Sequence, residues 1–212
     1  MGGTRIVAID GPAASGKGTL ARRLAKHFGY HYLDTGSLYR AVGMSVLRAG
    51  GDPSNETQAV AAAKALDLAS VSPAELKSDT AGNAASKVAF IPAVRAVLLE
   101  FQRDFAKKAP GAVLDGRDIG TVVCPDAPAK IFVTASLEVR VQRRIAELRA
   151  GGESVNEQGV WDDMKARDAR DSDRSVSPLK PADDAYILDT SKMDADQAFE
   201  TAKAYIATKK SR

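Results

Sequence analysis

The sequence predicts an α/β protein built on a parallel sheet of about five strands with helices on both faces. Three observations support this prediction. Short apolar runs alternate with amphipathic helical segments along the chain, a pattern typical of parallel sheets. The chain has 212 residues, enough for one domain with small appendages. A glycine-rich segment follows the first apolar run, as expected where a strand gives way to a helix.

In the first half of the chain, glycine and proline mark where the elements end. Leu20, Leu24 and Phe28 are spaced for one apolar helix face. Gly29 follows at the position where helices commonly end. Ser70–Gly82 is polar and contains a proline, so it is predicted as a loop or a weak short element. The predicted elements of this half are strands at Arg5–Asp10 and Tyr30–Asp34, and helices at Lys17–Phe28, Gly36–Ala49, Glu56–Leu68 and Ala84–Lys108, the last with a break or a new start near Pro92.

The second half continues the alternation with three apolar runs and three helices. Ser154 and Glu157 have the spacing of a capping box, which predicts the start of a helix that extends through the basic run ending at Arg174. Pro178 and Pro181 end that region. The other predicted elements are strands at Ala112–Leu114, Lys130–Ala135 and Ala185–Leu188, and helices at Leu137–Ala150 and Asp194–Lys209.

Composition and charge narrow the class of protein. The formal net charge is +3, from 30 basic and 27 acidic residues, which is too balanced to indicate a nucleic-acid partner. The single cysteine, Cys124, excludes an internal disulfide and lies in a short apolar context that predicts burial. No apolar stretch reaches the roughly 20 residues that span a bilayer, and no signal peptide is indicated. We therefore expect a soluble cytoplasmic protein without membrane or nucleic-acid partners, and a monomer as the simplest state.

A phosphate-binding loop is predicted at residues 11–19, which read GPAASGKGT. A strand, a glycine-rich loop, a lysine and a helix follow in the order that lets backbone N–H groups and a helix N-terminus surround an anion. Lys17 adds a mobile positive charge. The alternative is a glycine-rich turn that only links strand to helix. The candidate residues for nucleotide phosphates are Gly11, Pro12, Ala13, Ala14, Ser15, Gly16, Lys17, Gly18 and Thr19.

Gly18 stands between Lys17 and Thr19, whereas the general pattern has Ser or Thr directly after the lysine. No residue is therefore predicted as a direct metal ligand. Thr19 is a candidate for a phosphate contact or for a water molecule bound to Mg²⁺.

Three further segments place arginines where a second phosphate could bind. Arg40 follows the second predicted strand in DTGSLYR, and Arg117 follows a later strand in DGRD. Arginine suits this task because its planar guanidinium binds phosphate through two donors. In the run 165–174, Arg167, Asp171 and Arg174 fall on one helix face. The alternatives are a surface position for Arg40 and a solvated, ion-paired helix for the run, which otherwise resembles an arginine-bearing lid.

These motifs resemble the bacterial cytidylate kinases. GPAASGKGT, DTGSLYR, NAASKVAFIPAVR, DGRDIGTVVCPDAPAKIFVTAS and KARDARDSDRSVSPL occur in the family's order, from Ile6 to Asp189. The resemblance implies transfer of the γ-phosphoryl group of ATP to CMP or dCMP with Mg²⁺. Two alternatives stay open. One is another P-loop kinase acting on a different nucleotide or on shikimate. The other is a nucleotide-binding switch protein, although no Asn-Lys-x-Asp motif is present.

The resemblance also assigns roles to single residues. Lys17 would hold the phosphates of ATP, and the other expected catalytic residues are Arg117, Arg167, Arg170 and Arg174. The CMP phosphate would be bound by Thr35, Arg40, Arg117 and Arg174, the sugar by Arg167 and Asp171, and cytosine by Ser86, Arg95 and Asp118. The base assignment is chemically consistent, because an aspartate accepts from the amine of cytosine and an arginine donates to its acceptors.

The expected organisation is one P-loop kinase domain with two appendages. The core covers about residues 1–55, 98–150 and 183–212, the short segment that binds the nucleoside monophosphate about 56–97, and the helical lid about 151–182. Relatives from Gram-negative bacteria carry extra β-strands in that segment. Leu66–Asn83 is too short and too poor in β-branched residues for them, and Lys77 stands where the family has a phosphate-contacting arginine.

Overall fold

The computed structural model describes residues 5–67, 72, 75–76, 78–152 and 154–209. The chain divides into two compact units. One unit holds the residues up to Leu33 and from Ala106 onward, and we call it the sheet unit. The other, Asp34–Phe105, is the helical unit. Among the described residues, no helix is long and apolar enough to cross a membrane.

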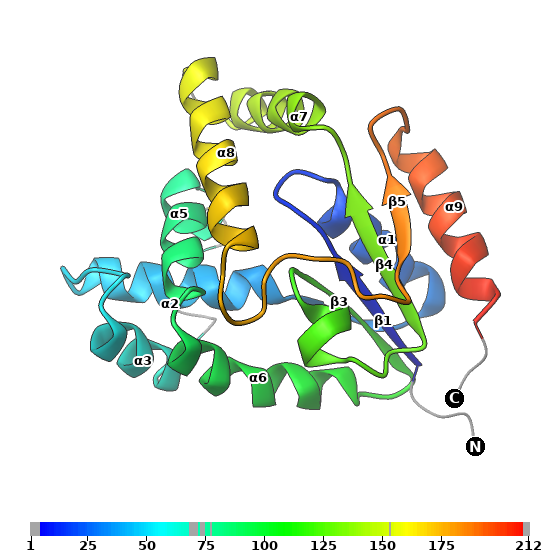
Figure 1. Ribbon diagram of the computed structural model, residues 1–212, viewed down its shortest axis with the longest axis horizontal. Helices are drawn as coiled ribbons and strands as arrows, with labels where there is room; N and C mark the ends of the chain where they lie inside the picture. Colours follow the sequence, from blue (N-terminus) through cyan, green and yellow to red (C-terminus); the bar gives the residue numbers. More distant parts are fainter. Residues whose placement is uncertain (1–4, 68–71, 73–74, 77, 153, 210–212) are drawn as a thin grey trace. The chain divides into compact units, whose positions relative to one another are not determined.

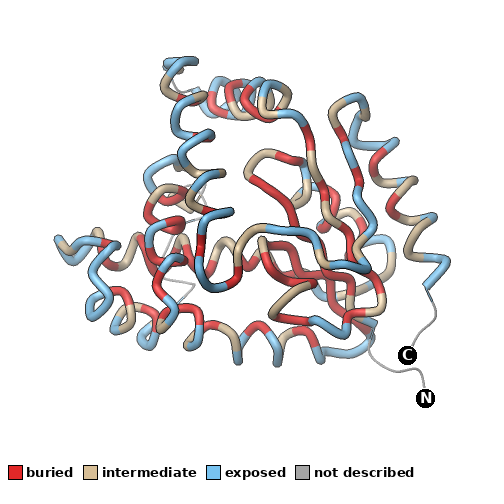
Figure 2. Tube along the Cα trace, viewed as in Figure 1, coloured by how far each residue is buried: buried red, intermediate tan, exposed pale blue. Residues whose placement is uncertain are grey.

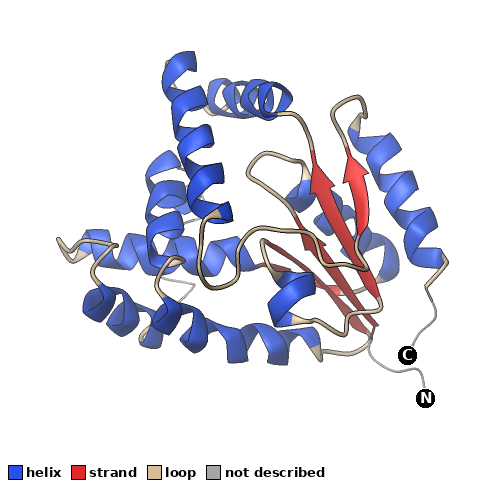
Figure 3. Ribbon diagram, viewed as in Figure 1, coloured by secondary structure: helices blue, strands red, loops and turns tan. Residues whose placement is uncertain are grey.

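The sheet unit is built on a five-stranded sheet in the order β2-β3-β1-β4-β5 (Figures 1 and 3). The pairings of β1 with β3, β1 with β4 and β4 with β5 are parallel. The sheet confirms the predicted fold, and it brings the carboxyl ends of the strands to one edge, where ligands bind in such sheets. The strands are β1 (Arg5–Asp10), β2 (His31–Asp34), β3 (Gly111–Gly116), β4 (Ala129–Thr134) and β5 (Tyr186–Asp189).

Two helices of the sheet unit, α1 (Lys17–Phe28) and α9 (Ala195–Ala207), pack against the sheet with their small and aliphatic residues. Two more, α7 (Leu137–Ala150) and α8 (Glu157–Ser172), pack against each other through a separate apolar cluster that also contacts Ala13 and Ala14 of the glycine-rich loop. Figure 2 shows strands β1, β3 and β4 largely buried, whereas β5 is mostly exposed. The packing therefore connects the predicted lid helix α8 to the loop through α7.

The helical unit contains α2 (Thr35–Arg48), α3 (Glu56–Lys64), α5 (Asp79–Val88) and most of α6 (Pro92–Ala106). Its core is formed by aliphatic side chains together with small residues that allow close helix contact. At the tightest point, a Cβ on Gly43 of α2 would lie 2.7 Å from the Cβ of Ala84 on α5. Small residues at this crossing are therefore required by the packing.

Several details of the predicted elements are wrong. Helix α5 begins at Asp79, inside the predicted loop, because Ser78 caps it and its small residues are buried. Helix α3 ends at Lys64, short of Leu68. Helix α8 is capped by Asn156, whose side chain accepts from the Gly159 N–H, so the expected Ser154–Glu157 capping box does not form. Between β3 and β4 the chain forms an unpredicted π-helical turn, Ile119–Val123 (η2).

Other expectations about the chain agree with the structure. Cys124 is buried, and Pro92 starts α6 as its first residue. The described residues between Leu66 and Asn83 form helix and turn and contain no strand. Lys77 lies outside the described residues.

Candidate functional site

The glycine-rich loop connects β1 to α1 in a conformation that exposes backbone donors. Gly16 precedes α1 with φ +90°, and no side chain caps the first N–H groups of this helix. A Cβ on Gly11 would lie 2.1 Å from the carbonyl oxygen of Val133, so only glycine fits there. An uncapped helix N-terminus preceded by a tight glycine loop is suited to bind an anion.

The carbonyl side of the loop is held by side chains from distant parts of the sheet unit. Ser15 O accepts hydrogen bonds from Thr190 Oγ1 at 3.1 Å and from Arg143 Nη1 at 3.3 Å. Lys17 Nζ donates to Pro12 O at 3.1 Å. Ser15 Oγ is buried and has no hydrogen-bond partner among the described residues. The loop is thus fixed through its carbonyls, while its N–H groups at the start of α1 carry no side-chain cap.

Arg140 of α7 joins this loop to α8 and was not singled out by the sequence analysis. Its guanidinium binds both carboxylate oxygens of Asp168, at 3.1 and 2.6 Å, and donates to Ala135 O at 3.0 Å and Ala13 O at 3.3 Å. The side chain is nearly buried. The only sequence signal was the basic character of the helix, because local spacing does not reveal a partner 28 residues away.

Three arginines of the predicted acceptor site gather around one carboxylate, that of Asp171. Arg117 Nε donates to it at 2.8 Å, and Arg174 forms a second ion pair with it. Burial by itself would raise the pKa of Asp171, but the charges of Arg117, Arg174 and Arg167 hold this pKa below its ordinary value. Arg174 follows the end of α8 and does not lie on the helix, a correction to the predicted single helix face. Arg170 is half-buried on the same helix.

Three aspartates lie at the carboxyl ends of β1 and β3. Asp118 is buried and begins the turn η2. Asp10 is buried, and its desolvation raises its pKa to about 7 against the opposing effect of two backbone hydrogen bonds. Asp115 accepts from Tyr32 Oη at 3.1 Å, and its Oδ2 lies 3.4 Å from the position of a Cβ on Gly18. Asp115 is the first residue of the DGRD turn, and no binding or catalytic role was predicted for it from the sequence.

In the helical unit, Arg40 is held by Asp34. The carboxylate of Asp34 caps α2 through the Ser37 N–H at 3.2 Å and forms an ion pair with Arg40. Thr35, the first residue of α2, is buried. The segment DTGSLYR therefore builds a helix N-terminus with an arginine fixed beside it, which is not the plain surface position considered as an alternative.

Ser86 and Arg95, expected to contact cytosine, are both buried within the helical unit. The guanidinium carbon of Arg95 lies 5.5 Å from the centroid of the Tyr39 ring, and Arg95 Nη1 donates to Ala89 O at 3.4 Å. Tyr39 directly precedes Arg40, so α2 carries both Arg40 and the ring that contacts Arg95. An arginine at a buried position requires such polar and aromatic partners.

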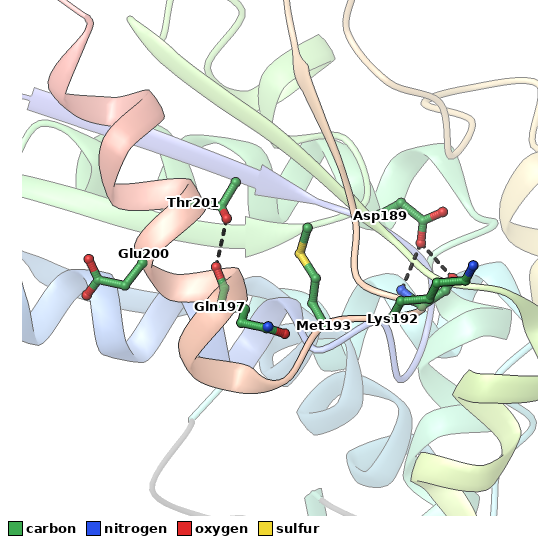
Figure 4. A pocket seen from close by; sticks show the side chains of 7 residues that line it. Asp189, Lys192, Met193, Gln197, Glu200 and Thr201 are labelled. Carbon is green, nitrogen blue, oxygen red and sulfur yellow. Dashed lines mark hydrogen bonds between the residues drawn. The ribbon is translucent and has the colours of Figure 1, made fainter.

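An open surface hollow lies where β5 meets α9 (Figure 4). At its edge Asp189 accepts hydrogen bonds from Ser191 N at 2.8 Å and Ser191 Oγ at 2.6 Å, as expected for a turn residue. None of the predicted site residues lines this hollow. Its lining residues are Asp189, Ser191, Lys192, Met193, Gln197, Glu200 and Thr201.

The sheet unit thus contains both the phosphate loop and the arginines around Asp171, whereas Thr35, Arg40, Ser86 and Arg95 belong to the helical unit.

Comparison with solved structures supports the fold. An uncharacterized protein from Eubacterium ventriosum matches with a TM-score of 0.57 at 16% identity, covering 97% of this chain and 100% of that one. A gluconokinase from Sinorhizobium meliloti matches with a TM-score of 0.51 at 12% identity, covering 96% and 91%.

Comparison with known sequences identifies the family. The sequence profile described as cytidylate kinase matches residues 7–208. A cytidylate kinase from Rhodospirillum rubrum is 61% identical over 208 residues, covering 96% of this chain and 98% of the relative. One from Granulibacter bethesdensis is 59% identical over 204 residues, covering 96% and 97%. These matches favour the predicted CMP kinase over the shikimate-kinase and switch-protein alternatives. The chain therefore belongs to the cytidylate kinase family, nucleoside monophosphate kinases in which ATP donates a phosphoryl group to CMP or dCMP.

Proposed function

We propose that this chain transfers the γ-phosphoryl group of ATP to CMP or dCMP, with the phosphate loop binding ATP and the arginines around Asp171 binding the acceptor. The observation that carries this proposal is a buried carboxylate that holds Arg117 and Arg174 in the same unit as an uncapped phosphate loop. Phosphoryl transfer requires cations at the transferred group, and both parts supply them.

On the donor side, the loop would bind the phosphates of ATP mainly through its main chain. The N–H groups at the start of α1 carry no side-chain cap, and the buried Ser15 Oγ has no hydrogen-bond partner among the described residues. Lys17 would exchange its bond to Pro12 O for a phosphate oxygen. We assign the donor phosphates to the nine residues Gly11, Pro12, Ala13, Ala14, Ser15, Gly16, Lys17, Gly18 and Thr19.

On the acceptor side, the α-phosphate of CMP would compete with Asp171 for the guanidinium groups. Arg117, Arg174 and Arg40 are each held beside a carboxylate, so they are already oriented before a phosphate arrives. The acceptor is itself an anion, and no side-chain base is needed. Orientation and charge neutralisation would supply most of the rate. Thr35 is assigned to the same phosphate, Arg167 and Asp171 to the sugar, and Arg170 to the lid.

Cytosine would be recognised through Asp118, with Ser86 and Arg95 assigned to the same base. The carboxylate of Asp118 would accept from the exocyclic amine, which uracil lacks. Facing uracil, this buried carboxylate would lose its donor, and such a loss costs enough to discriminate between the two bases.

Mg²⁺ is the expected metal, and the residues near Thr19 fit its chemistry. Asp115 Oδ2 lies 3.4 Å from the position of a Cβ on Gly18, the residue before Thr19, so both side chains offer oxygen atoms in this part of the loop. The described residues contain no group of three or more His, Cys, Asp or Glu that could enclose an ion. Mg²⁺ generally keeps several of its waters and binds nucleotide phosphates. When bound, Mg²⁺ would neutralise phosphate charge, and Asp115 and Thr19 would orient its water ligands.

Further expectations about the whole molecule belong to the same proposal. Residues 151–182 would act as a lid, residues 56–97 as the segment that binds the monophosphate, and the remainder as the core. The single cysteine is consistent with a reducing cytoplasm, and a monomer is the simplest state that would perform this reaction.

A coupled assay of ADP release tests the proposed function directly. The purified chain would be supplied with ATP and Mg²⁺ and with CMP, dCMP, UMP, AMP, GMP or shikimate in turn. Fast turnover with CMP and dCMP and little with UMP is expected. Preferred turnover of another acceptor would overturn the base assignment, and binding of ATP without any turnover would support a switch protein.

A further inference from the structure

Strand β1 ends in Asp10, a carboxylate that no part of the proposed mechanism uses. It directly precedes Gly11 of the phosphate loop, but its carboxylate is hydrogen-bonded to another segment. Oδ1 accepts from the Ile119 N–H at 2.7 Å and Oδ2 from the Gly120 N–H at 2.8 Å, and the side chain is buried. Asp10 therefore binds a segment 109 residues away in the sequence.

The two N–H groups belong to the first residues of the π-helical turn η2. Such turns close hydrogen bonds between residues five apart, here from Val123 N to Asp118 O at 3.1 Å and from Cys124 N to Ile119 O at 2.7 Å. The first N–H groups of any helical turn have no partner within it. Asp10 satisfies two of them with one bidentate carboxylate.

The residue that would ordinarily cap this turn is Asp118, yet its side chain makes no capping bond. Aspartate at this position usually accepts from an N–H two or three residues later. In η2 these N–H groups are instead capped by Asp10, which belongs to strand β1. Asp118, with φ −145° and ψ 24°, therefore leads into a turn whose first two N–H groups are bound by the end of β1.

We propose that Asp10 is a positioning residue for acceptor recognition: by anchoring η2 it fixes the adjacent side chains of Asp118 and Arg117 relative to the end of β1. This inference rests on the proposed function, which assigns Asp118 to cytosine and Arg117 to the CMP phosphate. It makes Asp10 a determinant of the CMP side of the reaction, despite its place next to the ATP-binding loop.

The electrostatic setting of Asp10 supports this role. Burial and, to a smaller extent, the neighbouring charge of Asp118 raise the pKa of Asp10, the two backbone donors and Arg117 lower it, and the net result is a pKa of about 7. An uncharged side chain would avoid the desolvation, but only an ionised carboxylate accepts from both N–H groups at once. In its ionised form Asp10 therefore makes a pair of bonds that a neutral side chain cannot make, at the cost of desolvating the charge.

The test is Asp10→Asn in the full chain, with kinetics measured separately against CMP, UMP and ATP. The amide is nearly isosteric but can accept from only one of the two N–H groups, and its NH₂ faces the other. We expect KM for CMP to rise about tenfold or more, the preference for CMP over UMP in kcat/KM to fall several-fold, and KM for ATP to stay within twofold. Asp189→Asn is the matched control, since Asp189 ends β5 and binds Ser191 without touching η2. Its KM for CMP should be unchanged.

A rise in KM for ATP with unchanged CMP kinetics would overturn the inference and place Asp10 in the support of the phosphate loop. Wild-type kinetics in Asp10→Asn would overturn it as well. If that variant does not fold, Gly120→Ala tests the same anchor, because the new Cβ would lie 3.4 Å from Asp10 Oδ2 and 3.2 Å from Lys130 Cδ. It should raise KM for CMP by a smaller factor, and an unchanged KM would contradict the inference. Failure of the proposed function is seen separately, as absent CMP turnover in the wild-type chain.

Discussion

The phosphate loop and the arginine cluster around Asp171 are the two parts of the sheet unit that we propose to bind phosphate, and they are built from different parts of the chain. The loop presents main-chain N–H groups, and its carbonyls accept hydrogen bonds from Arg140, Arg143 and Thr190. The cluster presents side-chain guanidinium groups, and a single carboxylate holds them.

This difference indicates where each region is vulnerable. A main-chain site depends on backbone conformation, so glycine positions and the bonds to carbonyls matter more than most side chains. A side-chain site depends on charge balance in a buried setting. Removing one partner leaves another charge uncompensated. Four substitutions distinguish the main-chain site from the side-chain site, and they follow from the largest expected effect to the smallest.

Arg117→Ala should have the largest effect, a fall in kcat of roughly 10³-fold, because it removes a cation that the proposed function places at the acceptor phosphate. Steady-state kinetics with CMP and ATP would measure it, and thermal unfolding would show a folded protein. Arg23→Ala, which breaks a surface ion pair with Asp196, is the matched control and should leave kcat unchanged. Turnover like that of the wild type in Arg117→Ala would remove this residue from the mechanism.

Asp171→Asn should lower the free energy of unfolding by about 3–5 kcal/mol at neutral pH, because Arg117 and Arg174 lose their shared buried counter-ion. The pKa of Asp171 is lowered in the folded protein from 3.8. The stabilisation is therefore complete above about pH 4 and is lost as the pH falls through the folded pKa. Urea unfolding at several pH values would measure the difference between the two proteins. A difference that stays constant down to pH 3 would show that the ion pairs are not its cause.

Thr190→Val should raise KM for ATP about fivefold and leave KM for CMP unchanged. It removes one donor to Ser15 O, a bond worth about 1 kcal/mol, while Arg143 keeps the other. Thr201→Val is the matched control, because Thr201 donates to a carbonyl of its own helix. If KM rose equally for ATP and for CMP, the bond from Thr190 to the loop carbonyl would not serve ATP binding specifically.

Ser15→Ala should have the smallest effect on stability. The buried hydroxyl makes no hydrogen bond among the described residues, so the free energy of unfolding should change by less than about 0.5 kcal/mol. KM for ATP should rise by no more than a few-fold if the main chain binds most of the phosphate. A loss of ATP binding measured by calorimetry would instead assign the loop's affinity to this side chain.

The two regions also differ in how well the sequence predicted them. Helix α1 has the predicted bounds, and the loop before it was recognised because strand, glycines, lysine and helix follow one another. Arg117 and Arg174 of the cluster were predicted as phosphate ligands and Arg167 as a sugar ligand, but the ion pairs of Arg117 and Arg174 with Asp171 were not predicted. Arg140 and Asp168 were missed altogether.

The sequence alone determined the alternation of strands and helices, the phosphate loop and the family, because each depends on residues that are close together in the chain. Periodicity and turn chemistry act over a few residues. Only the tertiary structure decided that Arg117 meets Asp171, Asp10 meets Ile119 and Thr190 meets Ser15, pairs separated by 54, 109 and 175 residues. A parallel sheet brings such distant segments to one edge. Which buried polar groups then satisfy one another is settled by packing, which no local pattern encodes.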